Sequence, residues 1–206
     1  MPTRLSLQRS GDDLLEIAVS SAEQARLLAQ EISGFGLCED IVPGMRSLSL
    51  RSHPSQMAAL EKAVSALSLP PEDAPHTGAV LAIEIQYGGP GGPDLPDICR
   101  TLDISKTTFI DRHTAATYTV DLIGFTPGFT YLTGLDSRLS VPRLATPRPR
   151  LRAGSVGISA AYTGIYALPG PGGWPIIGQT NMSLFEAEAA SPFRLQPGMR
   201  VRFKAV

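Results

Sequence analysis

The residues of this chain best suited to chemistry are arginines gathered in one loop. Residues 137–206 contain nine Lys and Arg against two Asp and Glu, whereas residues 1–136 contain nine against seventeen. An arginine guanidinium is planar and can donate two parallel hydrogen bonds to a carboxylate or a phosphate. The predicted anion-binding residues are Arg143, Arg148, Arg150 and Arg152, which lie among prolines that stiffen the loop. The alternative is a solvated basic loop, or one that docks on an acidic partner surface.

Aromatic residues precede this loop. Phe125, Phe129 and Tyr131 flank a Pro-Gly turn that could present them as the wall of a substrate pocket. Such side chains often fill the core of a β-rich domain instead, and the sequence leaves both interpretations open. Further along, Gln179 and Thr180 could hydrogen-bond a small polar substrate or satisfy a buried strand end.

A glycine-rich run, GGPGGPDL, occupies residues 88–95. Exposed backbone N–H groups of such a run can bind phosphate, which makes Gly88, Gly89 and Asp94 candidate phosphate-binding residues. The P-loop pattern is absent because no Lys-Ser or Lys-Thr follows the glycines, and Lys106 stands apart in another element. The alternative is a tight turn that leads into a helix, with Asp94 as its N-cap.

His113 lies near the end of a predicted helix at 105–115, where the helix dipole would favour its charged form. One prediction is a catalytic general acid or anion-binding group, and the other is a structural histidine bonded to a nearby carbonyl. No nucleophile motif is evident, since neither G-x-S-x-G nor S-x-x-K occurs. The three histidines are scattered, and the sequence predicts no metal site.

Composition limits the class of protein. Hydrophobic residues make up 43% of the 206 residues, enough for one large domain or two modest ones. No apolar run approaches the roughly 18 residues of a membrane span, and the N-terminus lacks the apolar core of a signal peptide. With two isolated cysteines and no nucleic-acid-binding motif, the sequence predicts a soluble cytoplasmic protein that binds neither membrane nor nucleic acid.

The hydrophobic periodicity predicts an α+β fold in two domains, at 1–70 and 77–206. The first domain is expected to contain strands at 4–8, 14–19 and 46–51 and helices at 21–33 and 55–67, with Ser21 as the N-cap of the first helix. The segment 69–76, LPPEDAPH, has the composition of a linker.

The second domain is expected to be mostly β, with helices near its start. Strands are predicted at 79–87, 117–123 and 200–206, and helices at 95–102 and 105–115, the second of which is capped by Ser105. The last strand alternates cleanly, with Val201, Phe203 and Ala205 facing inward. A closed barrel with helical covers fits this pattern.

The long motif GFTPGFTYLTGLDSRLSVPRLATPRPRLRAGSVGI, followed by TGIYALPGPGGWPIIGQT, closely resembles the family of the 5-oxoprolinase B subunit. This family has also been labelled allophanate hydrolase subunit 1 and includes the Kip-type inhibitor of a sporulation kinase. YGGPGGPDL at 87–95 and His113 fit its usual order of motifs, and VPGMRSLSLR at 42–51 looks like its N-terminal strand. The chain departs from the family pattern at Gly89-Pro90-Gly91, at Tyr162 and at Gln179.

The resemblance implies a small N-terminal α+β domain followed by a cyclophilin-like β-barrel. It implies a non-autonomous subunit of a complex that opens 5-oxo-L-proline to L-glutamate with ATP. The implied partners are the carboxyltransferase-like C subunit and the A subunit of 5-oxoprolinase, with ATP and Mg²⁺ at a site shared with the partner. In that reaction Arg150, with His113, is the predicted catalytic residue, because the step needs cations that balance phosphate charge.

Two other functions remain open at this stage. The chain could be a binding protein of the Kip type, which inhibits a kinase through its barrel surface. It could also belong to an allophanate- or urea-processing amidohydrolase, although such hydrolysis ordinarily uses a Ser-dependent site. A prolyl isomerase activity is discounted, because a barrel fold alone does not define a function.

Overall fold

The structure is a computed structural model that describes residues 5–70 and 79–206. The chain forms two compact units, Met1–Pro75 and His76–Val206. Most of the predicted linker, residues 71–76, lies outside the described residues. No helix in the described part of the chain is long and apolar enough to cross a membrane.

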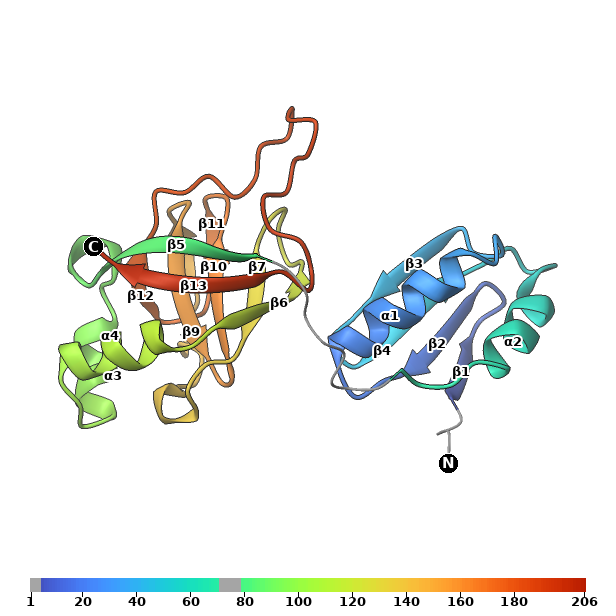
Figure 1. Cartoon of the computed structure of the whole chain (residues 1–206), viewed down its shortest axis with the longest axis horizontal. Helices are drawn as coiled ribbons and strands as arrows, with labels where there is room; N and C mark the ends of the chain where they lie inside the picture. The colour runs from blue at the N-terminus through green and yellow to red at the C-terminus, as the bar shows by residue number, and fades with distance from the viewer. Residues whose placement is uncertain (1–4, 71–78) are drawn as a thin grey trace. The chain divides into compact units, whose positions relative to one another are not determined.

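The first unit is an antiparallel sheet with two helices (Figure 1). Its strands are β1 (Ser6–Ser10), β2 (Leu14–Ala18), β3 (Asp40–Pro43) and β4 (Ser47–Arg51), and its helices are α1 (Ala22–Ser33) and α2 (Met57–Ser65). The strand order is β1-β2-β4-β3. The sequence pattern misses β3 because this edge strand has no fully buried residue and ends in a proline, which edges tolerate. It also places β1 two residues too early, at 4–8.

The core of this unit forms because β2 and β4 alternate between buried and more exposed positions. Leu15 and Ile17 of β2 are buried in one hydrophobic cluster with Leu28 and Ile32 of α1. The same cluster includes residues of α2 at helical spacing. The hydroxyl of Ser21 accepts a hydrogen bond from the Gln24 amide at 3.2 Å, which confirms the predicted N-cap of α1.

The second unit is built on a closed barrel in the strand order β10-β7-β6-β13-β5-β12-β9. Its strands are β5 (Val80–Tyr87), β6 (Tyr118–Ile123), β7 (Thr130–Thr133), β9 (Ser155–Ser159), β10 (Tyr162–Tyr166), β12 (Ile176–Gln179) and β13 (Arg200–Ala205). β13 pairs in parallel with β5 and antiparallel with β6, so the last strand closes the sheet (Figure 1). The predicted mixed fold with a closed barrel is confirmed.

Two helices follow β5. They are α3 (Leu95–Thr101) and α4 (Lys106–Ala115), and α4 contacts β13. Ser105 accepts a hydrogen bond from the Thr108 amide at 3.0 Å and caps α4, as predicted. Short 3-10 turns lie at Gly89–Gly91 (η1) and Ser137–Leu139 (η2).

The barrel interior is filled by one face of each strand. Val201 and Phe203 of β13 are buried there, whereas Ala205, the last residue of the strand, is exposed, so the alternation does not predict its burial. A separate two-stranded sheet, β8 (Arg148–Leu151) with β11 (Gly170–Gly172), completes the unit. Its two strands come from the arginine-rich loop and from the segment PGPGGW.

Candidate functional site

A pocket of about 280 Å³ lies where β7 and β10 meet the β8–β11 sheet. Five of the eleven residues that line it are aromatic, and they come from positions far apart in the sequence. They are Phe125, Phe129, Tyr131, Tyr166 and Trp174. The predicted aromatic wall of Phe125, Phe129 and Tyr131 therefore exists, although Phe129 is also fully buried.

The pocket lies on the outer face of the barrel wall. Residues of β10 alternate, so that Ile165 belongs to the barrel interior whereas Tyr166 belongs to a second cluster with Trp174. Gly164 stands opposite Gly157 across β10 and β9. A Cβ on Gly164 would lie 2.8 Å from Cζ3 of Trp174, so only glycine lets the indole lie this close to the strand.

The aromatic rings hold one another in edge-to-face contacts. The ring of Phe129 lies 4.7 Å from that of Tyr166, 4.8 Å from that of Tyr131 and 5.5 Å from that of Trp174, measured between centroids. The planes cross at 67° to 87°, the arrangement that aromatic quadrupoles favour. The wall of the pocket is consequently an interlocked aromatic cluster rather than a set of independent side chains.

Arg143 supplies the charge of this pocket. It is the one charged residue among the described lining residues, and its guanidinium acts to lower the pKa values of the Tyr131 and Tyr166 hydroxyls. Burial outweighs this effect and raises the pKa of both phenols, so both stay protonated at neutral pH. Within residues 5–70 and 79–206, Arg143 forms no ion pair.

Phe125 stands at the pocket with a strained backbone. Its φ is +72°, a left-handed conformation that is costly for a residue with a Cβ, and 63% of the residue is exposed. Its ring makes an edge-to-face contact with Phe129 at 5.7 Å. Strain of this kind is typical of functional loops, where the surrounding structure enforces it.

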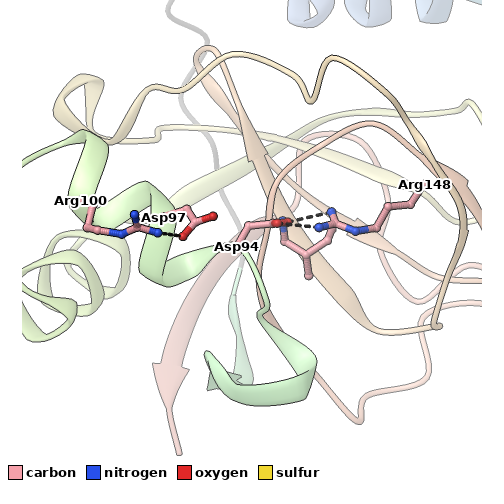
Figure 2. A network of polar contacts seen from close by, with 5 residues as sticks. Asp94, Asp97, Arg100 and Arg148 are labelled. Carbon is pink, nitrogen blue, oxygen red and sulfur yellow. Dashed lines mark hydrogen bonds and ion pairs between the residues drawn. The ribbon is translucent and has the colours of Figure 1, made fainter.

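The other predicted arginines are not in the pocket. Arg150 and Arg152 are exposed and do not line it. Arg148 forms a two-pronged ion pair with Asp94 (Figure 2), with nitrogen–oxygen distances of 2.6 and 2.8 Å. Arg148 and Asp94 therefore bind each other, and the substrate-binding role of Arg148 and the phosphate-binding role of Asp94 stay predictions.

Asp94 is not the predicted side-chain cap of α3 either. It occupies the N-cap position, but its side chain makes no capping hydrogen bond. One carboxylate oxygen accepts instead from the backbone amide of Ile176 at 2.6 Å. The local pattern suggested a cap because it contains no information on a partner 82 residues away.

The glycine run forms a turn against β12, and its phosphate-binding role stays a prediction. The amide of Gly88 donates to the carbonyl of Ile177 at 3.0 Å, and both Gly88 and Gly89 have positive φ. A Cβ on Gly88 would lie 3.2 Å from Nζ of Lys106, so the lysine that the sequence separates from this loop lies against it.

Gln179 and Thr180 line a different, polar groove of about 710 Å³ on the outer side of β5 and β13, beside Glu84 and Lys204. The side-chain amide of Gln179 donates from Nε2 to the backbone carbonyl of Ala153 at 3.0 Å. Thr180 is buried, and its hydroxyl accepts from the Met182 amide at 3.2 Å. The Thr180 hydroxyl thus binds the chain just beyond the end of β12, and its substrate-binding role stays a prediction.

His113 is buried in the barrel interior. Its Nε2 lies 3.1 Å from the Thr163 hydroxyl, which donates to the Gly157 carbonyl at 3.1 Å. The hydroxyl must then accept from Nε2–H, and Nδ1 accepts from the Tyr87 hydroxyl at 2.6 Å. Burial lowers the pKa of His113 to about 3, so the predicted charged form is wrong. The ring contributes to packing and does not line the pocket.

Sequence reasoning missed part of the pocket. Tyr166, Trp174 and Pro147 line it without having been predicted, and Trp174 is the only tryptophan of the chain. The signal that could have found Trp174 is PGPGGW, a dense turn motif that ends in a large aromatic residue.

A family model described as carboxyltransferase domain, subdomain C and D, matches residues 6–195. The 5-oxoprolinase B subunit of Escherichia coli O157:H7 is 37% identical over 199 residues, which cover 92% of this chain and 88% of that protein. The chain belongs to this carboxyltransferase-domain family and, within it, to the family of the 5-oxoprolinase B subunit.

Solved structures support the same relationship. The crystal structure of TTHA0988 matches with a TM-score of 0.77 at 30% identity. The match covers 100% of this chain and 40% of that longer chain. The uncharacterized protein PH0987 from Pyrococcus horikoshii matches with a TM-score of 0.61 at 31% identity, over 98% of this chain and 97% of that one. Members of the fold thus occur both at this length and within a longer chain.

Proposed function

We propose that this chain is the B subunit of a 5-oxoprolinase, a non-autonomous part of a cytoplasmic complex that opens 5-oxo-L-proline to L-glutamate with ATP. The observation that carries the proposal is the pocket, which joins aromatic walls to a single guanidinium in a member of the B-subunit family. A small ring that bears one carboxylate is the ligand that such a pocket suits.

The chemistry of 5-oxoproline matches the pocket at two points. The apolar face of its five-membered ring can pack on the rings of Phe129 and Trp174. Its carboxylate can accept two hydrogen bonds from the exposed guanidinium of Arg143. Tyr131 and Tyr166 remain protonated phenols, which suit donation to the lactam oxygen.

The described residues do not fit a complete Mg²⁺·ATP site. No group of three or more His, Cys, Asp or Glu in the described part of the chain is arranged to hold a metal ion. Asp94 is committed to Arg148, and the amide of Gly88 to Ile177. We therefore propose that the C and A subunits of 5-oxoprolinase complete the catalytic set, and that ATP binds at a site to which the partner contributes most of the ligands.

The test is reconstitution. The chain is co-expressed with candidate C and A subunits from the same genome, and glutamate formation from 5-oxoproline is measured with ATP present and with each subunit omitted in turn. The proposal predicts turnover that needs ATP and all three chains. A purified three-chain complex without 5-oxoproline-dependent glutamate formation would contradict it, as would full activity without this chain.

A further inference from the structure

The Asp94–Arg148 pair connects three segments of the second unit. The two carboxylate oxygens of Asp94 accept from the two terminal nitrogens of Arg148, which is a strong and directional geometry (Figure 2). The Asp94 side chain is 15% exposed and that of Arg148 32%, so water screens the pair only partly. Asp94 lies at the end of the glycine run, and Arg148 begins β8.

Asp94 also forms hydrogen bonds with the backbone just after Trp174. Its side chain accepts from the Ile176 amide at 2.6 Å, and its own backbone amide donates to the Ile176 carbonyl at 3.1 Å. Because one residue lies between Trp174 and Ile176, the carboxylate fixes one end of the segment that carries the indole into the pocket.

Arg148 holds another segment of the same wall in place. It follows Pro147, which lines the pocket, and it pairs in register with Gly172 of β11, which lines it too. Gly173 lies against Pro147, and its carbonyl accepts from the Leu144 amide at 2.8 Å. Displacing Arg148 would thus release the β8–β11 side of the pocket.

We infer that Asp94 and Arg148 are positioning residues, which hold the Pro147 and Trp174 sides of the aromatic pocket against the glycine run. Neither side chain needs to touch the ligand. The inference rests on the proposed function only in taking this pocket as the ligand site, and the holding action itself does not depend on the identity of the ligand.

A matched control pair lies on the neighbouring helix. Asp97 and Arg100 of α3 form an ion pair three residues apart (Figure 2), with side chains 72% and 78% exposed. This pair contains the same two residue types but joins no separate segments. Replacing it leaves the pocket wall unchanged, because its partners belong to one turn of one helix.

The experiment uses Trp174 as the reporter, since the chain has no other tryptophan and this one is 5% exposed. Asp94→Asn, Arg148→Gln and Arg148→Lys are compared with Asp97→Asn and Arg100→Gln in the full-length chain. The readouts are the tryptophan emission maximum, acrylamide quenching, far-UV circular dichroism and a fluorescence titration with 5-oxoproline.

We expect Asp94→Asn and Arg148→Gln to red-shift the Trp174 emission and to raise its quenching constant about twofold, because the wall opens locally while the barrel stays folded. Binding of 5-oxoproline should weaken about tenfold or more, since small displacements of a pocket are costly. Arg148→Lys keeps the positive charge but cannot donate two parallel hydrogen bonds to Asp94. Its Trp174 emission, quenching constant and 5-oxoproline affinity should lie between those of wild type and of Arg148→Gln. The two control variants should behave as wild type.

Wild-type emission and quenching in folded Asp94→Asn and Arg148→Gln would overturn the inference. So would a loss of thermal stability without any change at Trp174, which a merely structural pair would produce. If Asp94→Asn does not fold, Arg148→Lys decides by the same readouts. If wild type binds no 5-oxoproline, the proposed ligand fails, whereas the quenching comparison still tests the positioning role.

Discussion

Thr163 and Gly164 are neighbours on β10 that face opposite sides of the barrel wall. The Thr163 hydroxyl bonds to His113 in the interior, whereas Gly164 lies beneath Trp174 on the outside. One strand therefore supports both the buried polar network and the floor of the pocket. The two predicted site residues His113 and Phe129 lie on different sides of this wall.

Gly164→Ala tests the floor of the pocket. The new Cβ would meet Trp174 at 2.8 Å and Phe129 at 3.0 Å, so we expect a loss of about 1–3 kcal/mol in the free energy of unfolding from overpacking. Urea denaturation measures it. The control is Gly170→Ala, where no atom lies within 4 Å of the new Cβ. Equal stabilities of the two variants would show that the indole does not rest on Gly164.

The pH dependence of stability tests the neutral His113. Burial lowers its pKa to about 3 in the folded state, against about 6.5 when unfolded, so the unfolded state binds the proton first. The stabilisation is complete above pH 6.5 and decreases as pH falls from about 6.5 towards 3, by about 1.4 kcal/mol per pH unit. We expect His113→Gln to flatten the curve of unfolding free energy between pH 6 and pH 4, since glutamine does not titrate.

The exposed His53 supplies the control for this measurement. His53→Gln should keep the wild-type slope between about pH 6 and pH 4, because this substitution leaves the buried His113 in place. A slope for His113→Gln as steep as that of wild type would contradict the neutral, buried histidine.

Phe125 offers a separate test of strain and binding. Both Phe125→Ala and Phe125→Gly remove the ring from the pocket and should weaken ligand binding. Glycine adopts a φ of +72° freely, so Phe125→Gly should be more stable than Phe125→Ala by about 1 kcal/mol. Thermal denaturation compares the two. If Phe125→Ala is more stable than Phe125→Gly, the result contradicts a left-handed backbone at residue 125.

The sequence was sufficient where local rules decide the structure. The caps at Ser21 and Ser105 and the alternation of Val201 and Phe203 are properties of a few consecutive residues, and the structure contains them. The family motifs, together with this alternation, led to the closed barrel. Ala205, at the end of β13, is where the alternation fails to predict burial.

The site was less predictable because long-range contacts assemble it. Arg143 and Arg150 have the same local context, yet only Arg143 lines the pocket. Asp94 has the local appearance of a cap, but Arg148 and Ile176 reach it across more than fifty residues. No spacing rule within one element predicts either outcome, since both depend on how β8 and β12 meet the glycine run.

The measurement that bears most directly on the account is 5-oxoproline-dependent turnover of the reconstituted complex with Arg143→Gln and Arg150→Gln in this chain. The account predicts that Arg143→Gln lowers turnover at limiting 5-oxoproline roughly tenfold or more. The reason is that the ligand carboxylate loses its charged partner, which costs about 1.5–3 kcal/mol of binding free energy. Arg150→Gln, outside the pocket, should stay near wild type. Full turnover with Arg143→Gln, or its loss only with Arg150→Gln, would contradict the assignment of this pocket.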